Sequence, residues 1–277
     1  MTVKLIAIDV DGTLLDSAKN LHPGVKSAIE EADRRGVLLA LCTGRSPREI
    51  RELSARIPEI SYGITANGAY VVDLGNGGVV FADTMGAREI RTVWKTLSGF
   101  DMMFEIFTDH QVLTDGRCLG NPDHYGVGEL KELVVSTRTG IKDLVGAVES
   151  GQVREAGKIN IFFPSSRERD RAKALSRDLP FYITSQEPTN LEFTKREVNK
   201  GTGLKMLAES LGIKRDSIMA IGDNNNDLPM IEYAGIGVAM ENGLPEVKRA
   251  ADFVTKSNED DGVAWAIRKL VFQEKSL

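Results

Sequence analysis

The stretch Val-Lys-Leu-Ile-Ala-Ile-Asp-Val-Asp-Gly-Thr, residues 3–13, joins a short apolar run to a pair of carboxylates. Residues 3–8 are apolar apart from one lysine and rich in branched side chains, which is typical of a strand buried in a parallel sheet. Asp9 and Asp11 follow at the end of this strand, and Gly12 allows the chain to turn sharply there. Because ligands of open α/β sheets bind outside the carboxyl ends of the strands, this stretch predicts both a sheet and a functional site.

Strand-like and helix-like segments alternate near both ends of the chain. The expected strands are residues 3–8, 37–42, 62–65, 217–221, 236–240 and 252–254. The expected helices are residues 23–35, 200–211, 228–233, 245–250 and 262–272, with a further helix that begins at Ser46-Pro47. Strands that alternate with helices of this length imply a parallel sheet with right-handed crossovers. We therefore expect an α/β fold with a doubly wound, Rossmann-like core.

The middle of the chain has a different pattern, in which strand and helix signals mix. Strands are expected at residues 102–107, 158–163 and 181–184, helices at 88–97, 141–148 and 167–179, and a loop at 116–128. Gly75-Asn76-Gly77-Gly78 marks a hairpin turn just before this region. We expect a core domain formed by residues 1–83 and 189–277, interrupted by an α+β cap of domain size at residues 84–188.

The amino-acid composition argues against several classes of function. The 277 residues are 42% hydrophobic and 27% charged, with 35 Lys+Arg against 40 Asp+Glu and a formal net charge of −5. This balance, which lacks a basic block, argues against nucleic acid as a partner. No apolar run approaches the ~20 residues that span a bilayer, so no membrane partner is expected. Cys42 and Cys118 are isolated thiols, which is typical of a reducing compartment. The apolar run at the N-terminus is too short for a signal peptide and reaches an acidic residue at Asp9, so we expect a cytoplasmic protein.

A second acidic cluster follows another predicted strand. Residues 222–227 read Gly-Asp-Asn-Asn-Asn-Asp and come directly after the apolar residues 217–221. If this strand neighbours the first one, Asp223 and Asp227 join the first acid pair in one pocket. Four carboxylates in one place require a divalent cation, and a set of oxygen ligands favours Mg²⁺. A turn capped by a single aspartate would explain one of these clusters but not their matched placement.

Two further positions provide hydrogen-bond donors and a positive charge that can bind an anion. Thr43 follows the strand at residues 37–42, and the turn Thr43-Gly44-Arg45 offers a hydroxyl and backbone N–H groups to phosphate oxygens. Lys200 begins a predicted helix after the insert, where an ammonium ion can neutralise a phosphoryl oxygen or hold a carboxylate. Each residue alone is ordinary, because threonine is common at strand ends and most lysines are solvated.

These residues together resemble the haloacid dehalogenase superfamily of phosphotransferases. The matches are Asp9-Val10-Asp11-Gly12-Thr13 to the first motif, Thr43 to the second, Lys200 to the third and residues 222–227 to the fourth. The segments that resemble its Cof-type sugar-phosphatase branch are residues 9–15, Thr43-Gly44-Arg45, Ala66-Asn67-Gly68-Ala69 and Asn226-Asp227. That branch carries an α/β cap between the second and third motifs, where the insert lies in this chain. Four motifs in order are far more specific than any one of them.

The resemblance implies a role for each residue. Asp9 is implied to attack phosphorus and form an aspartyl phosphate, while Asp11 protonates the leaving oxygen and then deprotonates water. Mg²⁺ is implied to bind Asp9, the backbone carbonyl of Asp11 and Asp223, with Asp227 nearby. The residues implied to bind or border the phosphoryl group are Thr43, Gly44, Asn67, Lys200 and Asn226. The implied partner is a small phosphorylated metabolite, with sugar phosphates favoured.

Three other functions fit parts of this pattern. A sugar phosphomutase shares the nucleophile but returns the phosphoryl group to a sugar. A phospho-aspartate receiver also needs paired acids, a threonine and a lysine at sheet ends, although Asp11 is positioned to hydrolyse the intermediate rather than preserve it. A sugar-phosphate-binding protein without activity would not require Asp11.

If the protein is a phosphatase, we expect the insert to close over the sheet ends and to select the leaving group. The candidate contacts within the insert are Glu105, Asn121, His124 and Asn160.

Overall fold

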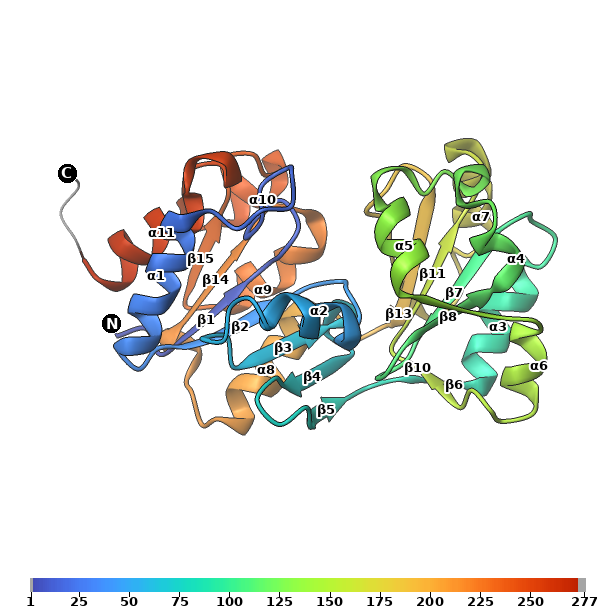
Figure 1. Cartoon of the computed structure of the whole chain (residues 1–277), viewed down its shortest axis with the longest axis horizontal. Coiled ribbons are helices and arrows are strands. Elements are labelled where there is room, and N and C mark those ends of the chain that lie inside the picture. The colour runs from blue at the N-terminus through green and yellow to red at the C-terminus, as the bar shows by residue number, and fades with distance from the viewer. Residues whose placement is uncertain (1, 274–277) are drawn as a thin grey trace. The chain divides into compact units, whose positions relative to one another are not determined.

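The computed structural model describes residues 2–273, which form two compact units (Figure 1). The first unit contains the residues up to Arg45, Ile50–Phe81 and the residues from Asn199 onward. The second contains Ser46–Glu49 and Ala82–Val198. The first unit is thus built from both ends of the chain, and the second is inserted between them.

An eight-stranded sheet forms the centre of the first unit, with the strand order β16-β15-β14-β1-β2-β3-β4-β5. Its strands are β1 (Leu5–Ile8), β2 (Leu38–Cys42), β3 (Tyr62–Thr65), β4 (Tyr70–Asp73), β5 (Val79–Ala82), β14 (Ile218–Gly222), β15 (Ile236–Ala239) and β16 (Phe253–Val254). The strands from β16 to β3 are parallel, and β4 runs antiparallel to β3. The expected doubly wound parallel core is confirmed, and β1 lies in the middle of it.

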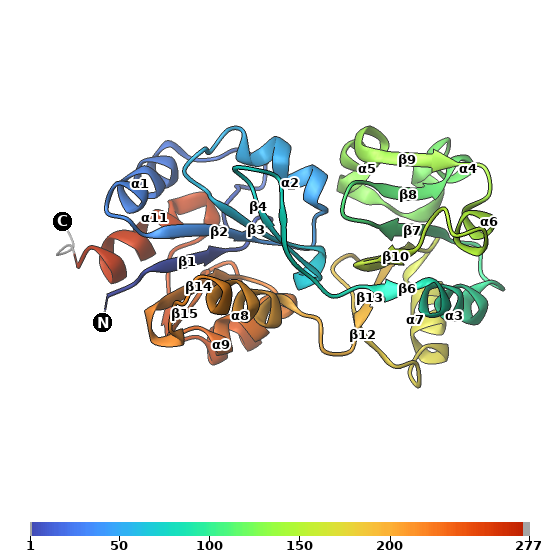
Figure 2. The ribbon, with the colours of Figure 1, turned by 90° about the horizontal axis from the view of Figure 1, so that it is seen from below.

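Helices cover both faces of this sheet. They are α1 (Pro23–Arg34), α2 (Pro47–Ser54), α8 (Lys200–Ser210), α9 (Leu228–Tyr233), α10 (Pro245–Ala250) and α11 (Gly262–Ala266), followed by a π-helical turn at Ile267–Val271. In α1, Val25, Ala28, Ile29 and Ala32 are buried at helical spacing, so one face packs inward. Helices α1 and α11 lie against one face of the sheet and α8 and α9 against the other (Figure 2).

The second unit is built around a six-stranded sheet with the order β12-β13-β11-β7-β8-β9. Its strands are β7 (Met103–Phe107), β8 (Val112–Asp115), β9 (Arg138–Ile141), β11 (Lys158–Phe162), β12 (Phe181–Thr184) and β13 (Asn190–Lys195). A short ladder joins β6 (Met85–Gly86) to β10 (Glu155–Ala156). Helices α3 (Ala87–Leu97), α6 (Leu144–Glu149) and α7 (Ser166–Leu175) pack their apolar residues on one face of the sheet.

Several elements of the second unit differ from the sequence expectation. Strand β13 lies beyond the expected boundary at residue 188, because it pairs with both β11 and β12 and so belongs to this sheet. The expected loop at 116–128 contains helix α4 (Gly116–Leu119) and a 3₁₀ turn at Pro122–Tyr125. The expected helix at 141–148 begins later, because Ile141 pairs with Asp115 in β9 and the Asp143 side chain caps the helix by accepting Gly146 N–H.

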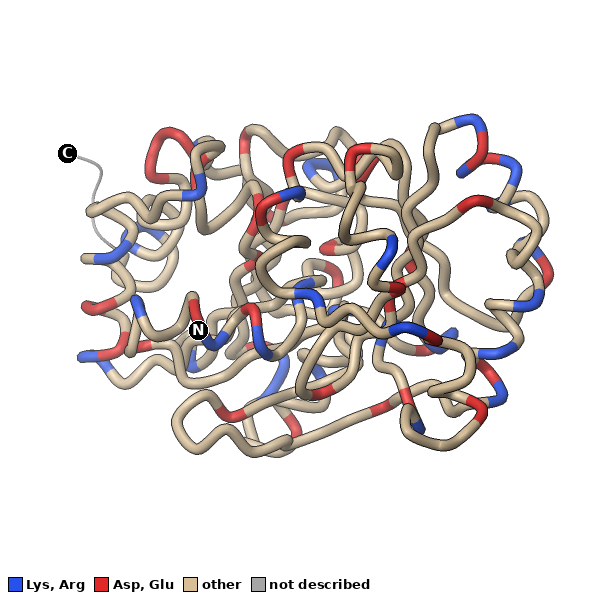
Figure 3. Tube along the Cα trace, turned by 45° about the vertical axis from the view of Figure 1, so that its right-hand side comes forward, with Lys and Arg blue, Asp and Glu red and all other residues tan. Residues whose placement is uncertain are grey.

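No helix within residues 2–273 combines the length and apolarity required to cross a membrane. Basic and acidic residues are interspersed along the traced chain (Figure 3).

Candidate active site

Three neighbouring strands of the first unit end at the same edge of the sheet. Ile8 of β1 lies opposite Ile221 of β14 and Leu41 of β2 in the two parallel ladders. The residues that follow these strands are consequently brought together, although they are far apart in sequence. Asp9 N–H continues the ladder by donating to Ile221 O at 3.0 Å, which fixes the backbone of Asp9 beside the end of β14.

Lys200 reaches this edge from the first position of α8. Its side chain is 1% exposed, and Nζ donates to Asp9 Oδ1 at 2.6 Å and to Asp227 Oδ1 at 2.5 Å. Burial alone would lower the pKa of this lysine, but the adjacent carboxylates of Asp227 and Asp9 outweigh it and raise the pKa above its ordinary value. The side chain of Lys200 is therefore a buried, charged ammonium ion.

The turn that carries Asn67 packs directly against the start of α8. Gly68 has φ +100, and a Cβ atom there would lie 2.1 Å from Asn199 O, so only glycine allows this approach. Asn67 itself has φ 57, a left-handed conformation that asparagine tolerates. Asn226 Nδ2 donates to Asn67 Oδ1 at 3.4 Å, and this bond joins two predicted site residues that are separated by 159 positions.

Asp227 organises the loop after β14. Its Oδ2 atom accepts the backbone N–H groups of Asp223 and Asn224, each at 2.9 Å, while Oδ1 accepts from Lys200. The residue is fully buried. Both oxygens of this carboxylate are thus already engaged by protein donors.

Asp223 is held against the turn that follows β1. Thr13 Oγ1 donates to Asp223 Oδ1 at 2.7 Å. Gly12 has φ +85, and a Cβ atom there would lie 2.7 Å from Asp223 Oδ2. Position 12 therefore requires glycine for two reasons, the positive φ and the close approach of the Asp223 carboxylate.

The carboxylates of Asp9, Asp223 and Asp227 form a group that could hold a metal ion, since one oxygen from each lies within 4.8 Å of the others. Burial, reinforced by Asp227, raises the pKa of Asp9 well above its ordinary value despite Lys200. Burial and Asp227 likewise raise the pKa of Asp223 to about 6. One ammonium ion does not balance the charge of two buried carboxylates and one partly buried carboxylate, and their all-oxygen donor set fits a hard divalent cation.

The Asp11 side chain is not part of this group of carboxylates. Arg45 donates to it twice, from Nε to Oδ2 at 2.8 Å and from Nη2 to Oδ1 at 2.7 Å, and Lys19 Nζ lies 3.0 Å from Oδ1. Burial alone would raise the pKa of Asp11, but the two cations outweigh it and lower the pKa to about 2. Of the four acids expected in one pocket, the structure gathers three side chains and pairs the fourth with Arg45.

Thr43 completes the edge at the end of β2. Its side chain is 2% exposed, and Oγ1 accepts Arg45 N–H at 3.2 Å, so the hydroxyl uses a lone pair and keeps its proton for another acceptor. Thr43 O accepts Asn67 N–H at 3.1 Å, which ties the two expected phosphate-binding segments together.

Three residues in contact with the predicted acids were not predicted as site residues. Arg45 and Thr13 lie inside the stretches that carry the motifs, so their closeness to Thr43 and Asp11 in sequence was an available signal. Lys19 lies in a loop and carries no comparable pattern, and only the folded loop brings its side chain to Asp11.

Comparisons with known proteins identify the family of the chain. The family model of haloacid dehalogenase-like hydrolases matches residues 6–267. YxeH of Bacillus subtilis is 35% identical over 97% of this chain and 98% of its own. The 5-amino-6-(5-phospho-D-ribitylamino)uracil phosphatase YcsE of the same organism is 31% identical, with 97% and 96% covered. A solved structure of a haloacid dehalogenase-like hydrolase from B. subtilis superimposes with a TM-score of 0.85 at 27% identity, covering 97% of this chain and all of that one.

Proposed function

The chain belongs to the haloacid dehalogenase-like hydrolases and is a phosphatase of that family, and from this premise we propose a specific reaction. It hydrolyses small phosphate monoesters, with sugar phosphates favoured, in a Mg²⁺-dependent reaction through an aspartyl phosphate on Asp9. The observation that carries this proposal is the buried Lys200 ammonium ion, 2.6 Å from Asp9 within a group of three carboxylates.

The metal proposal follows from the donor set. Asp9 and Asp223 are the proposed direct ligands, together with the backbone carbonyl of Asp11. Asp227 already accepts three hydrogen bonds, so its proposed role is to hold Lys200 and the Asp223 loop beside the ion. When bound, Mg²⁺ supplies positive charge that offsets the carboxylates and the phosphoryl oxygens.

Asp9 and Asp11 have different proposed roles, Asp9 as the nucleophile and Asp11 as the general acid and base. Lys200 orients one oxygen of Asp9, and the proposed nucleophile is the other oxygen, which attacks phosphorus opposite the leaving alkoxide. Asp11 would donate a proton to that alkoxide and later take one from the water that hydrolyses the acyl phosphate. Because Arg45 and Lys19 favour the ionised form of Asp11, its proton must be acquired when substrate binds and these contacts loosen.

Phosphoryl binding is proposed for Thr43, Gly44, Asn67, Lys200 and Asn226. Thr43 has a hydroxyl proton left to donate, and Lys200 provides a fixed positive charge. Asn226 is mostly buried, and its Nδ2 atom donates to Asn67 Oδ1 at 3.4 Å, so the amide has a second N–H group to offer to a phosphoryl oxygen. Donors held in place before substrate arrives stabilise the charge that develops in the transition state.

The substrate class is proposed from the relatives. Two of them, YcsE and YwtE, at 31% and 30% identity, are named phosphatases of 5-amino-6-(5-phospho-D-ribitylamino)uracil, which carries its phosphate on a sugar-derived chain. We propose that residues 82–198 select among such leaving groups.

We also propose that the protein acts in the cytoplasm, because Cys42 and Cys118 are free thiols.

The test is steady-state phosphate release from a panel of sugar, polyol and aryl phosphates with saturating Mg²⁺. We expect turnover that chelation abolishes and that Asp9→Asn lowers by several orders of magnitude while the variant stays folded. Rapid quenching with labelled ester should trap an acid-stable, hydroxylamine-sensitive acyl phosphate. Near-normal turnover by Asp9→Asn would refute the covalent route. Hexose phosphate isomerisation without phosphate release would identify a mutase, and phosphorylation without turnover would identify a receiver.

A further inference from the structure

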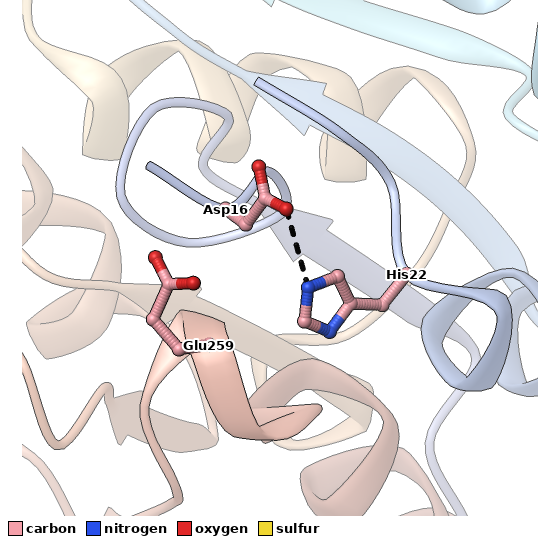
Figure 4. A group of neighbouring side chains, drawn as sticks. All are labelled: Asp16, His22 and Glu259. Atoms are coloured by element: carbon pink, nitrogen blue, oxygen red, sulfur yellow. Dashed lines mark ion pairs between the residues drawn. The ribbon is translucent and has the colours of Figure 1, made fainter. Parts of the chain in front are cut away.

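A second group of potential metal ligands lies in the first unit and contains no residue of the proposed active site. It consists of Asp16 and His22, from the segment between β1 and α1, and Glu259, from the 3₁₀ turn Asn258–Asp260 (Figure 4). One ligand atom from each residue lies within 4.8 Å of the others. Figure 4 shows the His22 ring turned toward Asp16, with the Glu259 carboxylate beside them.

His22 lies between two carboxylates that face different ring nitrogens. Nε2 is 3.3 Å from Asp16 Oδ2, and Nδ1 is 3.5 Å from Asp261 Oδ1. Asp261 Oδ1 is buried and accepts no hydrogen bond from the residues that the structure describes, so it is an acceptor suited to the Nδ1 proton. An imidazole that carries its proton on Nδ1 has its lone pair on Nε2, which faces Asp16. A carboxylate behind the ring is the usual arrangement that orients a metal-binding histidine.

The carboxylates of Asp16 and Glu259 are also held in place by hydrogen bonds. Asp16 is mostly buried, and its Oδ1 atom accepts Asn20 N–H at 2.7 Å. Glu259 Oε1 accepts Ser17 N–H at 2.8 Å, although Glu259 is 242 positions away in sequence. A backbone donor therefore holds one oxygen of each carboxylate, so both side chains are oriented independently of the His22 ring.

We propose that Asp16, His22 and Glu259 form a second metal site, structural in role, which takes a first-row transition ion such as Zn²⁺. An imidazole nitrogen with two carboxylates suits Zn²⁺ and Co²⁺ and disfavours Mg²⁺, which prefers oxygen donors alone. Ligand atoms around tetrahedral Zn²⁺ are roughly 3.3 Å apart, so the side chains need approach by no more than roughly 1.5 Å. The ion would tie the loop after β1 to the segment before α11.

The proposed site and the active site differ in a way that an experiment can use. The carboxylate group at Asp9 contains no histidine, so a histidine-bound ion reports only on the second site. The chain has three histidines. His124 is a matched control, because its Nε2 atom also lies near a carboxylate, 2.6 Å from Asp101, and this is its single carboxylate pair within residues 2–273.

The test is a titration of the metal-stripped full-length chain with Co²⁺ while Mg²⁺ is kept saturating. We expect one equivalent of Co²⁺ with visible d–d absorption, displaced by Zn²⁺, and a rise in Tm with either ion. His22→Gln should weaken Co²⁺ binding by at least about 10-fold, the effect typical of losing a ligand or its orienting partner. His124→Gln should bind as the parent does, and His22→Gln should retain Mg²⁺-dependent phosphatase activity.

Three results would overturn the proposal. These are the absence of a Co²⁺ equivalent in the presence of Mg²⁺, binding that persists in His22→Gln, and loss of binding in His124→Gln. If His22→Gln does not fold, Glu259→Gln takes its place, since its side chain is exposed and the substitution retains an acceptor for Ser17 N–H. Co²⁺ binding by Glu259→Gln at parental affinity and with a parental spectrum would count equally against the site.

Discussion

Nζ of Lys200 lies 2.6 Å from Oδ1 of Asp9, and the same ammonium ion holds Asp227 at 2.5 Å. The lysine thereby links the end of the first strand to the loop after β14. Its charge compensates the buried carboxylates of Asp9 and Asp227, and we propose that it also binds a phosphoryl oxygen. The two uses make separate predictions for stability and for activity.

Replacement of Lys200 by Met should destabilise the metal-free protein by about 3–5 kcal/mol, because it leaves buried carboxylates without their counter-ion. The value of kcat/KM should fall by about 100-fold or more. Urea unfolding and steady-state kinetics with saturating Mg²⁺ measure the two effects. Lys205→Met is the control on the same helix, since Lys205 forms an exposed pair with Glu209 at 3.8 Å, and it should change stability by less than about 1 kcal/mol.

Gly12→Ala should raise the Mg²⁺ concentration needed for half-maximal activity. The substitution costs roughly 1–2 kcal/mol for the left-handed backbone alone. It also pushes a methyl group toward Asp223 Oδ2, to 2.7 Å in the unrelaxed structure. Gly36→Ala separates the two effects, because Gly36 has φ +76 but open space around its Cβ position. Equal Mg²⁺ requirements in both variants would exclude a role for the close approach.

Metal binding should strengthen as the pH rises from about 4 to 6. The pKa of Asp223 is raised by burial and by Asp227 from its ordinary value of 3.8 to about 6 in the fold, so the metal-free fold binds this proton more tightly than the unfolded chain does. Stability of the metal-free protein therefore declines as pH rises through this window, and a bound cation reverses that decline. The increase in Tm caused by Mg²⁺ should be larger at pH 7.5 than at pH 5. In Asp223→Asn, the difference between the two pH values should become smaller but should not vanish, because the pKa of Asp9 is raised as well.

Arg45→Met should raise the pKa of Asp11 from its lowered value of about 2. The guanidinium group donates two hydrogen bonds to this carboxylate, and without them burial acts against only Lys19. Carboxyl ¹³C NMR titration of the metal-free protein measures the pKa directly. Arg51→Met, on α2, is the control for loss of a nearby exposed arginine, and it should leave the titration of Asp11 unchanged. An Asp11 that still titrates near pH 2 in Arg45→Met would show that other groups stabilise its ionised form.

Local patterns predicted most of the core. The run at residues 3–8 and the spacing of Val25, Ala28, Ile29 and Ala32 are properties of adjacent residues, and both appear as expected in β1 and α1. Strand β13 was missed because its pairing with β11 and β12 is a long-range property. The start of α6 was misplaced for a similar reason, since Ile141 extends β9.

The sequence by itself determined that acids, a threonine and a lysine stand at strand or helix ends, because the strand pattern and the motifs are written in neighbouring residues. Only the tertiary structure decided which of those groups meet. The order β14-β1-β2 brings Asp9, Asp223 and Asp227 together around Lys200, whereas Arg45 and Lys19 draw the Asp11 side chain into a separate ion pair. The partners of a charge depend on sheet order and loop geometry, which bring together residues that are far apart in sequence, such as Lys200 and Asp9, 191 positions apart.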